Sequence, residues 1–496
     1  MDSSHITLIL IVSTLLYHAI RRYIFFRSYP PGPRGPPFIG AAFEMPREKE
    51  WVTYDKWKRK YGPIVGLTSF GQPIVILNTA QLAQQVLNGR QNIYSDRPPF
   101  PMLEMMGFLD WNMGIMKSGP TLSLARRLFA QEFSPSGAAE YSDVHKEEVS
   151  MLLKRLGEEP SRFTWAIRRF NVGLILKIFY GLLVEDKEGH DDFVQLNDHV
   201  ITATSLAGSP AAYLVNTFPF LKYWPSSFPG AAFKKDALEG LNLSERLVNA
   251  PHETLRERLA RVDTLHRRSF LGKQATLQHG PDTELHQKAA HAAVATAYGA
   301  GVETSTSVLL TFILCMVHYP KVQRKAQADI DHVIAGRLPS LEDKETGKLP
   351  IIDAIVKECF RWRPPGNFAL PHKLIQDDIV SGYMLPKDTV VMSNVWSILH
   401  DENEYPHPME FNPDRFLNDK LQADPRDHVF GYGRRICPGR HLADRSLWLA
   451  IASILACFDI LPERDEKGNV KYPTIDYTSG VMSRPKDFHC IIKPRK

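Results

Sequence analysis

A single cysteine in a glycine-rich segment, directly before a long apolar run, constrains this 496-residue chain more than any other feature. Residues 430–439 read FGYGRRICPG, and the apolar residues 442–458 predict a buried helix. Glycines let backbone N–H groups approach a sulfur atom, a helix N-terminus favours negative charge, and Arg435 adds a cation. Cys437 is therefore expected to be a rigidly held, ionised, metal-binding thiolate. From these residues alone, a small buried hydrophobe is an equally good interpretation.

The same ten residues resemble the haem-binding signature of the cytochrome P450 family. The family pattern Phe-x-x-Gly-x-Arg-x-Cys-x-Gly is matched at Phe430, Gly433, Arg435, Cys437 and Gly439. The resemblance implies that Cys437 is the axial ligand of haem iron, that Phe430 packs beside the sulfur and that Arg435 faces a haem propionate. An anionic sulfur ligand donates electron density to the iron and favours O–O cleavage.

Composition excludes several other classes of protein. Sixty Lys and Arg against 55 Asp and Glu give a net charge of +5, without a basic run typical of nucleic-acid binding. The five cysteines are scattered and never form a Cys-x-x-Cys pair, which favours neither a disulfide framework nor a zinc site. A membrane surface or an acidic protein is therefore a better expected partner than nucleic acid.

The N-terminus carries an apolar segment long enough to cross a membrane. Residues 6–20 are uncharged and apolar, and aromatic residues extend the run to about twenty-one residues, enough for a bilayer. Basic residues follow this run instead of preceding it, which argues against a cleaved signal peptide and places the rest of the chain in the cytosol. We expect residues 1–28 to form a single-pass anchor and the proline-rich residues 29–37 to form a stiff extended hinge.

Residues 285–318 predict a long buried helix that contains the unusual segment AGVET. A glycine inside a helix costs about 1 kcal/mol relative to alanine, and from the residues alone a hydroxyl that bends the helix is the favoured interpretation. The segment resembles the distal Ala-Gly-x-Asp/Glu-Thr element of the family, formed here by Ala300, Gly301, Glu303 and Thr304. The resemblance implies that Gly301 opens a groove for dioxygen, that Thr304 hydrogen-bonds the bound oxygen and that Glu303 relays protons.

Other segments resemble structural and propionate-binding elements of the family. Glu358 and Arg361 occupy one face of a predicted helix, and with Arg415 of a downstream Pro-x-Arg-Phe segment they resemble the triad that maintains the core behind the haem. Alone, the Glu–Arg spacing would indicate only a surface ion pair. Propionate contacts are implied for His372, in a Pro-His-Lys segment, and more weakly for Arg97; a solvent-facing histidine is the alternative.

One departure from the family pattern concerns the stretch around residue 122. The family usually has Trp-x-x-x-Arg there, with both residues bound to a propionate. Counted back from Arg126, the tryptophan position holds Leu122, and Gly119 and Pro120 replace the usual polar start of the helix. Either this propionate anchor is weakened or the stretch reflects an imperfect gene model.

The rest of the chain predicts mainly helices. We expect a helix and a two-stranded hairpin over residues 51–78, further helices over residues 134–156, 165–180, 191–207 and 233–266, and an exposed loop over residues 267–282. Residues 100–116 show no clean periodicity and are expected to form a loop, which in the family lies over the substrate. The expected apolar substrate pocket is lined by Phe100, Met102, Met113, Ala297, Phe368, Leu370 and Val481.

The resemblance covers essentially the whole chain and implies a mainly α-helical fold with small β-sheets, in which residues 38–496 form one catalytic domain. It implies haem b as cofactor, electrons from NADPH through a separate flavoprotein reductase, and attachment to the endoplasmic reticulum membrane. The expected reaction inserts one oxygen atom from O₂ into an apolar small molecule. Segments such as residues 218–233 look most like fungal members of secondary metabolism, which favours a terpenoid.

Several alternatives stay open at this point. The substrate could be an indole, a polyketide or a xenobiotic. A haem-thiolate isomerase or dehydratase would need neither a reductase nor Thr304. A haem sensor would keep Cys437 but would not need the pair formed by Glu303 and Thr304.

Overall fold

The computed structural model describes residue 13 and residues 25–46, 48–183, 192–208, 212–259, 268–276, 283–417 and 422–495. The apolar run of the expected membrane anchor lies almost entirely outside the described residues. The chain divides into two compact units. The sheet unit comprises Met1–Pro98 and Pro371–Ile398, and the helical unit comprises Pro99–Leu370 and Leu399–Lys496.

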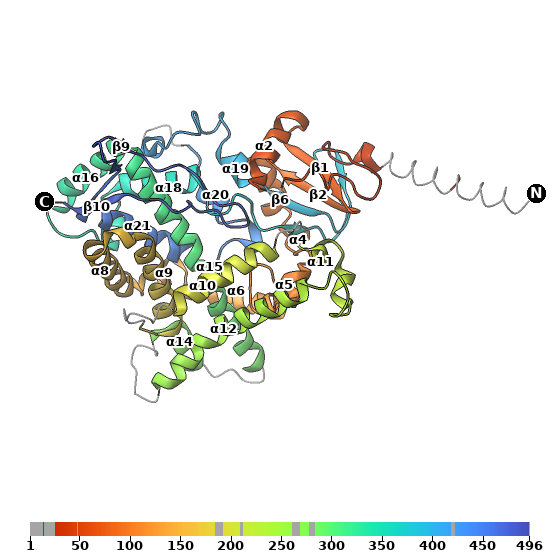
Figure 1. Ribbon diagram of the computed structural model, residues 1–496, viewed down its shortest axis with the longest axis horizontal. Coiled ribbons are helices and arrows are strands. Elements are labelled where there is room, and N and C mark those ends of the chain that lie inside the picture. Colours follow the sequence, from red (N-terminus) through yellow and green to blue (C-terminus); the bar gives the residue numbers. More distant parts are fainter. Residues whose placement is uncertain are drawn as a thin grey trace, which may run out of the picture. The chain divides into compact units, whose positions relative to one another are not determined.

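The sheet unit is built around a four-stranded sheet in the order β1-β2-β6-β3 (Figure 1). β1 (Ile64–Ser69) and β2 (Gln72–Leu77) form a hairpin, whose two turn residues both have positive φ, as the right-handed twist of the strands favours. β2 pairs in parallel with β6 (Val390–Ser393), which pairs antiparallel with β3 (His372–Lys373). Two distant chain segments therefore share one sheet.

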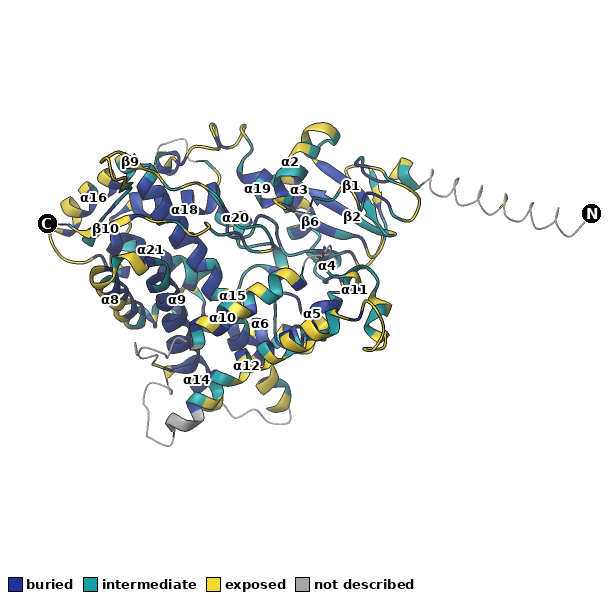
Figure 2. Cartoon of the chain, viewed as in Figure 1, coloured by how far each residue is buried: buried dark blue, intermediate teal, exposed yellow. Residues whose placement is uncertain are grey.

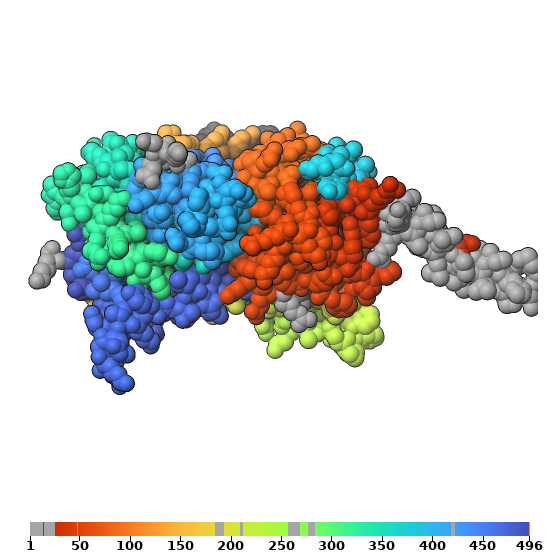
Figure 3. Space-filling view, turned by 90° about the horizontal axis from the view of Figure 1, so that it is seen from above, coloured from red at the N-terminus to blue at the C-terminus, as the bar shows by residue number. Residues whose placement is uncertain are grey.

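Helices and a second hairpin complete the sheet unit. They are α2 (Glu50–Tyr61), α3 (Ala80–Ala83), η1 (Gln84–Asn88), α4 (Gln91–Tyr94) and α19 (Val395–Leu399), with β4 (Asp378–Val380) paired to β5 (Tyr383–Leu385). Figure 3 shows part of the 371–398 segment, in cyan, against the N-terminal segment in red and orange. The helix and hairpin expected over residues 51–78 are confirmed.

The helical unit is organised around α15 (Thr283–His318). Four further long helices pack against it: α6 (Pro120–Glu132), α9 (Phe163–Tyr180), α18 (Pro350–Trp362) and α21 (Arg440–Cys457). Among the described residues, α15 is the one helix long and apolar enough to span a membrane, but most of that stretch is buried inside the protein. Figure 2 shows this core in dark blue, with exposed residues on the outer helices.

The remaining helices and strands of the helical unit surround this core. The helices are α5 (Pro101–Met105), η2 (Phe108–Asp110), α7 (Pro135–Ala139), α8 (Ser142–Glu158), η3 (Pro160–Arg162), α10 (Asp192–Ala207), α11 (Leu214–Thr217), η4 (Pro219–Tyr223), α12 (Phe233–Leu259), α14 (Phe270–Thr276), α16 (Pro320–Ile334), α17 (Leu341–Glu345), η5 (Pro413–Phe416), α20 (Arg426–Val429) and η6 (Gly433–Arg435). The strands are β7 (Phe458–Leu461), paired with β10 (Ile491–Pro494), and β8 (Glu463–Arg464), paired with β9 (Val470–Lys471).

Most of the expected helices are present, but two loop predictions were wrong. The stretch expected as an exposed loop over residues 267–282 contains α14, which buries Phe270 against Phe133 and Phe179 with ring centroids 6.1 Å and 5.9 Å apart. A single aromatic anchor can hold a short helix in place without producing the periodicity that predicts one. Residues 100–116 likewise contain α5, whose residues Met102 and Leu103 are buried.

Candidate active site

The loop that carries Cys437 is held in one shape by its backbone. The Cys437 N–H donates to the carbonyl of Phe430 at 2.6 Å, which closes the loop between α20 and α21. Gly431 and Gly433 have φ values of +78° and +51°, a region where a side chain would be strained. The Phe430 ring packs edge-on against Phe360 at 5.3 Å between centroids. Two of the glycines in this loop are therefore explained by a backbone conformation that other residues rarely adopt.

The cations that act on the Cys437 sulfur differ from Arg435, the cation expected from the sequence. Burial raises the pKa of the Cys437 thiol above its usual range, while a hydrogen bond from the Gly439 N–H and the charges of Arg126 and Arg440 act in the opposite direction. Arg126 and Arg440 therefore act on the sulfur in place of the expected Arg435, and the ionised, metal-bound state of Cys437 stays a prediction. A coordinated metal ion deprotonates a thiol outright, so ionisation would accompany metal binding.

Arg435 instead joins the cysteine loop to the segment before α6. Its buried guanidinium donates to the carbonyls of Met116 at 2.9 Å and Met113 at 3.4 Å, and to the Ser118 hydroxyl at 3.3 Å. Several hydrogen bonds from one charged group fix its direction. The contact with a haem propionate implied for Arg435 stays a prediction.

α6 is built in the register that the sequence indicated. Pro120 starts the helix, where its missing N–H has no cost. Leu122 is buried in the core, and Arg126, one turn further along, donates from Nη2 to the carbonyl of Ile436 at 2.5 Å. Arg126 therefore reaches the residue beside Cys437, although no tryptophan precedes it by one turn.

Between residues 292 and 317, one narrow stripe of α15 is accessible and the rest of the helix is buried. Thr296, Ala300 and Thr304 recur at four-residue spacing, which places them on one face, and Gly301 lies beside them. A Cβ on Gly301 would come within 3.3 Å of Ile175 Cδ1 on α9. Close helix packing is therefore a structural reason for this glycine, and its role toward dioxygen stays a prediction.

The Thr304 hydroxyl is bonded within its own helix. Its Oγ1 donates to the carbonyl of Ala300 at 3.1 Å and lies 3.4 Å from that of Gly301. A hydroxyl bonded to its own helix backbone is the interpretation that the residues of this segment favour when they are taken alone. Thr304 remains on the accessible stripe, so this bond does not exclude the hydrogen bond to oxygen that the family resemblance implies.

Glu303 points to a different face of α15. It is buried and forms ion pairs with Arg484 Nε at 3.1 Å and with Arg168 Nη2 at 3.6 Å. Ser307, one turn along, donates to the carbonyl of Ser483 at 2.7 Å. Thus Glu303 belongs to a polar seam that holds the C-terminal segment against α15. In the part of the chain that the structure describes, no hydrogen bond joins the Glu303 and Thr304 side chains.

Glu358, Arg361 and Arg415 come together as the sequence motifs suggested. Arg361 donates through Nε and Nη2 to the two carboxylate oxygens of Glu358 at 2.7 Å and 2.8 Å, and Arg415 Nε donates to Oε1 at 3.2 Å. The side chains of Glu358 and Arg361 are both 0% exposed. The alternative of an ordinary surface pair is therefore wrong for these residues.

The two remaining propionate candidates lie in the sheet unit. His372 is buried, and its Nδ1 lies 2.7 Å from the carbonyl of Tyr94. Arg97 is also buried and donates from Nη1 to the carbonyl of Pro371 at 2.7 Å. A solvent-facing His372 is therefore excluded, and the propionate roles of both residues stay predictions.

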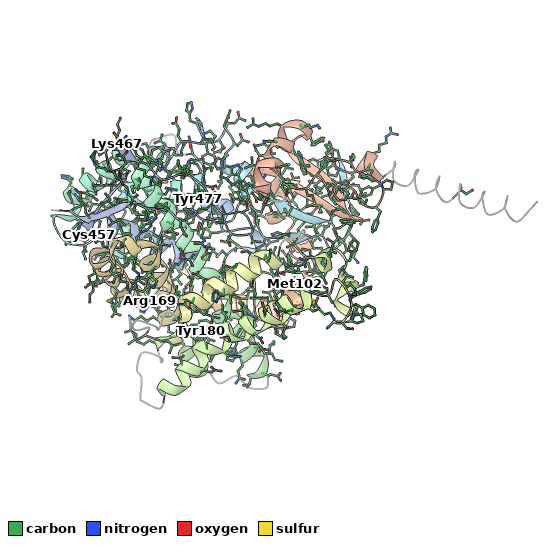
Figure 4. All side chains as sticks on the ribbon, viewed as in Figure 1. Met102, Arg169, Tyr180, Cys457, Lys467 and Tyr477 are labelled. Atoms are coloured by element: carbon green, nitrogen blue, oxygen red, sulfur yellow. The ribbon has the colours of Figure 1, made fainter. Side chains whose placement is uncertain are left out.

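The expected pocket residues divide by accessibility. Met102 (Figure 4), Met113 and Ala297 are buried, whereas Val481 is 39% exposed. Phe100, Phe368 and Leu370 are partly accessible. The lining of a pocket therefore stays a prediction for the whole set, and the three buried residues belong to the packed core.

One polar connection in this region could not be predicted from the sequence. The Thr296 hydroxyl donates to the carbonyl of Trp111 at 2.9 Å and accepts from the Met113 N–H at 3.0 Å. Trp111 Nε1 in turn donates to the Ser244 hydroxyl on α12 at 2.8 Å. The 108–116 segment is thus bonded to both α15 and α12, through partners more than a hundred residues away that no local pattern marks.

Comparisons with known proteins identify the family of this chain. The family model "Cytochrome P450" matches residues 30–491. Cytochrome P450 monooxygenase 208 of Postia placenta is 42% identical over 473 residues, covering 94% of this chain and 90% of the relative. The tryptamine 4-monooxygenase of Psilocybe cyanescens is 36% identical over 500 residues, covering 98% and 97%.

A solved structure shares the fold. A zebra fish cytochrome P450 structure with abiraterone has a TM-score of 0.72 at 24% identity and covers 90% of this chain and all of its own. The expected mainly helical fold with small sheets is thereby confirmed. The chain belongs to the cytochrome P450 family and is similar along almost its whole length to fungal monooxygenases of that family.

Proposed function

We propose that this protein is a haem-thiolate monooxygenase that inserts one oxygen atom from O₂ into an apolar small molecule, with a terpenoid or another fungal secondary metabolite as the first substrate class to test. The observation that carries the proposal is the rigid cysteine loop, in the same unit as an α15 helix with a narrow accessible stripe at Ala300 and Thr304. Oxidoreductase chemistry is general to the family.

The residues present fit haem b. Cys437 is partly accessible and supplies one soft anionic donor, the ligand type that gives haem its thiolate chemistry. Arg126 bonds the residue beside it, and the buried cation of Arg435 lies on the same loop. Haem bound there would supply an iron centre that activates O₂.

The chain's own residues would position oxygen and move protons. The Thr304 hydroxyl, which is bonded to the Ala300 carbonyl, lies on the accessible stripe and could turn to donate a hydrogen bond to a ligand there. Glu303 is buried between two guanidinium groups, so it must release one of them to pass a proton on. Arg168 also contacts Asp198, which is partly exposed, so Asp198 can hold this guanidinium when Glu303 releases it.

A membrane location and an external electron source complete the proposal. Residues 1–28 would anchor the chain in the endoplasmic reticulum membrane, and electrons would come from NADPH through a separate reductase. Several large apolar side chains around α11 and η4 are exposed, which supports a second contact with lipid; they are Leu214, Phe220, Tyr223 and Phe228. If deletion of residues 1–28 left the protein fully membrane-bound, the attachment would have to be assigned to this second surface instead of residues 1–28.

Two substrate classes deserve direct comparison. The printed name of the Psilocybe cyanescens relative gives tryptamine as its substrate, which keeps an indole as the second candidate for this chain. The expressed protein should be assayed with a panel of terpenoids and a panel of indoles, with and without reductase and NADPH. We expect oxygenated terpenoid products that need both. Turnover without reductase would instead indicate an isomerase or dehydratase, and a preference for indoles would overturn the substrate class alone.

A further inference from the structure

Six charged side chains in the helical unit form a closed ring in which the sign alternates at every step. In order, the ring consists of Asp424, Arg426, Asp444, Lys344, Asp353 and Lys357, and then returns to Asp424. The six N–O distances round it are 2.7, 2.9, 2.8, 3.7, 3.2 and 3.3 Å. We call this set the charge ring. Each member therefore has an opposite charge on both sides.

Arg426 is the centre of the charge ring. Besides its two neighbours in the ring, it reaches Asp353 across the ring at 3.4 Å, so it contacts all three carboxylates. Its Nε and Nη2 form a fork with Asp424 at 3.0 Å and 2.7 Å. A planar guanidinium can serve three carboxylates at once, which the point charge of a lysine cannot do as well.

The charge ring joins both ends of the segment that carries Cys437. Arg426 begins α20, four residues before Phe430, whose carbonyl closes the cysteine loop. Asp444 lies in α21, seven residues after Cys437. Figure 1 labels α18, α20 and α21 in the same part of the helical unit, and the ring bonds all three together with α17.

The charge ring differs from ordinary surface ion pairs. Its six side chains are only 16–32% exposed, and ion pairs of this kind are screened less by solvent and act as a network. Burial alone would raise the pKa of Asp444, but Lys344 and Arg426 outweigh it and hold the pKa below its usual range. The carboxylate is therefore charged in the folded protein at neutral pH.

We infer that the ion pairs of the charge ring hold the Cys437 loop in place from both ends, an arrangement we call the clasp. Arg426 is then a positioning residue for the thiolate. It touches neither substrate nor reacting atoms. Without it, the ends of the 424–444 segment could move relative to α18, and the sulfur would leave its position before the fold is lost. The inference rests on the proposed ligation of haem iron by Cys437.

The test uses the full-length holoenzyme with its haem. The reduced protein is bound to carbon monoxide at a fixed, moderate urea concentration, and the decay of the thiolate-type absorption band is timed. Far-ultraviolet circular dichroism on the same samples gives the unfolding midpoint. The variants are Arg426→Met, Arg426→Lys and, as a milder change in the same ring, Lys344→Met. Lys325→Met removes an equal charge from an exposed pair with Asp414 and is the matched control.

We expect Arg426→Met to speed the loss of the band roughly tenfold while its unfolding midpoint stays close to that of the wild type, because a partly buried network is weakened without removal of core packing. Lys344→Met should act in the same direction but less, and Arg426→Lys should restore part of the difference. Lys325→Met should match the wild type.

Two outcomes would refute the clasp alone, and a third would refute the ligation by Cys437 as well. Band loss at the wild-type rate in both Arg426→Met and Lys344→Met would refute the clasp. Band loss that follows global unfolding in every variant would reduce the charge ring to general stabilisation and would also refute it. A wild-type protein without any thiolate-type band would instead refute the ligation by Cys437, and the clasp with it.

Discussion

Replacement of Glu358 by glutamine tests the buried triad most sharply, because one carboxylate there offsets two guanidinium groups. Glu358 accepts from Arg361 at 2.7 Å and 2.8 Å, from Arg415 at 3.2 Å and from the Asn412 N–H at 2.7 Å. Glu358→Gln removes the negative charge and leaves two cations uncompensated in the core. Breaking a buried pair on one side costs about 3–5 kcal/mol, so we expect a loss of that size.

The structure also predicts the order of two substitutions. Arg415→Met leaves the neutral pair of Glu358 and Arg361 intact, so it should cost less than Glu358→Gln. Arg361 keeps hydrogen bonds to the carbonyls of Pro408 and Glu410 in both variants. The matched control is Glu159→Gln, which breaks an exposed pair with Arg162 and should cost less than about 1 kcal/mol.

Urea unfolding of the holoenzyme, followed by circular dichroism, gives the free energy of unfolding of each variant, and the haem absorbance after gel filtration gives the fraction that retains haem. A loss for Glu358→Gln no larger than that for Glu159→Gln would refute the assignment of a buried, charge-coupled triad. A larger loss for Arg415→Met than for Glu358→Gln would refute the argument that one carboxylate offsets both cations.

Three further predictions concern separate parts of the helical unit. Thr304→Ala should lower product per NADPH and raise peroxide, whereas Thr304→Ser should keep most of the coupling; unchanged yield in the alanine variant would leave only the bond to the helix backbone. Arg126→Ala should speed haem transfer to an apoglobin on the order of tenfold, since a hydrogen bond from a charged group is worth about 1.5–3 kcal/mol, while Arg127→Ala on the exposed side of α6 should not; equal rates would exclude Arg126 as an anchor. Burial lowers the pKa of His145 to about 4, so the folded state stays neutral while the unfolded state takes up a proton below about pH 6.5; this should cost about 3 kcal/mol of stability as the pH falls from 7 to 4, and His145→Gln should flatten that part of the pH profile.

The sequence was most informative where a short pattern decides a local conformation. The periodicity of residues 285–318 predicted α15, which begins at Thr283 and ends at His318. The register counted back from Arg126 correctly placed Leu122 on a helix, α6. The cysteine loop followed from its glycines, two of which have positive φ. These features depend on neighbours in the chain, so one sequence is enough to predict them.

Contacts between distant segments were not predictable in this way. Arg126, on α6, is one of the two cations near Cys437, although it is far from Cys437 in the chain. The direction of Glu303 depends on Arg168 and Arg484, which no spacing relates to it. The charge ring likewise collects members from residues 344–444, each of which reads alone as an ordinary surface charge.

The most direct test of the account is the reduced carbon monoxide difference spectrum of the purified full-length protein beside that of Cys437→Ala. The other four cysteines, Cys315, Cys359, Cys457 and Cys490, do not lie in a glycine-rich loop before a helix. We therefore expect a thiolate-type band from the wild type and none from the variant, even when haem is supplied in excess. An unchanged thiolate-type band in Cys437→Ala would contradict the assignment of Cys437 as the haem ligand.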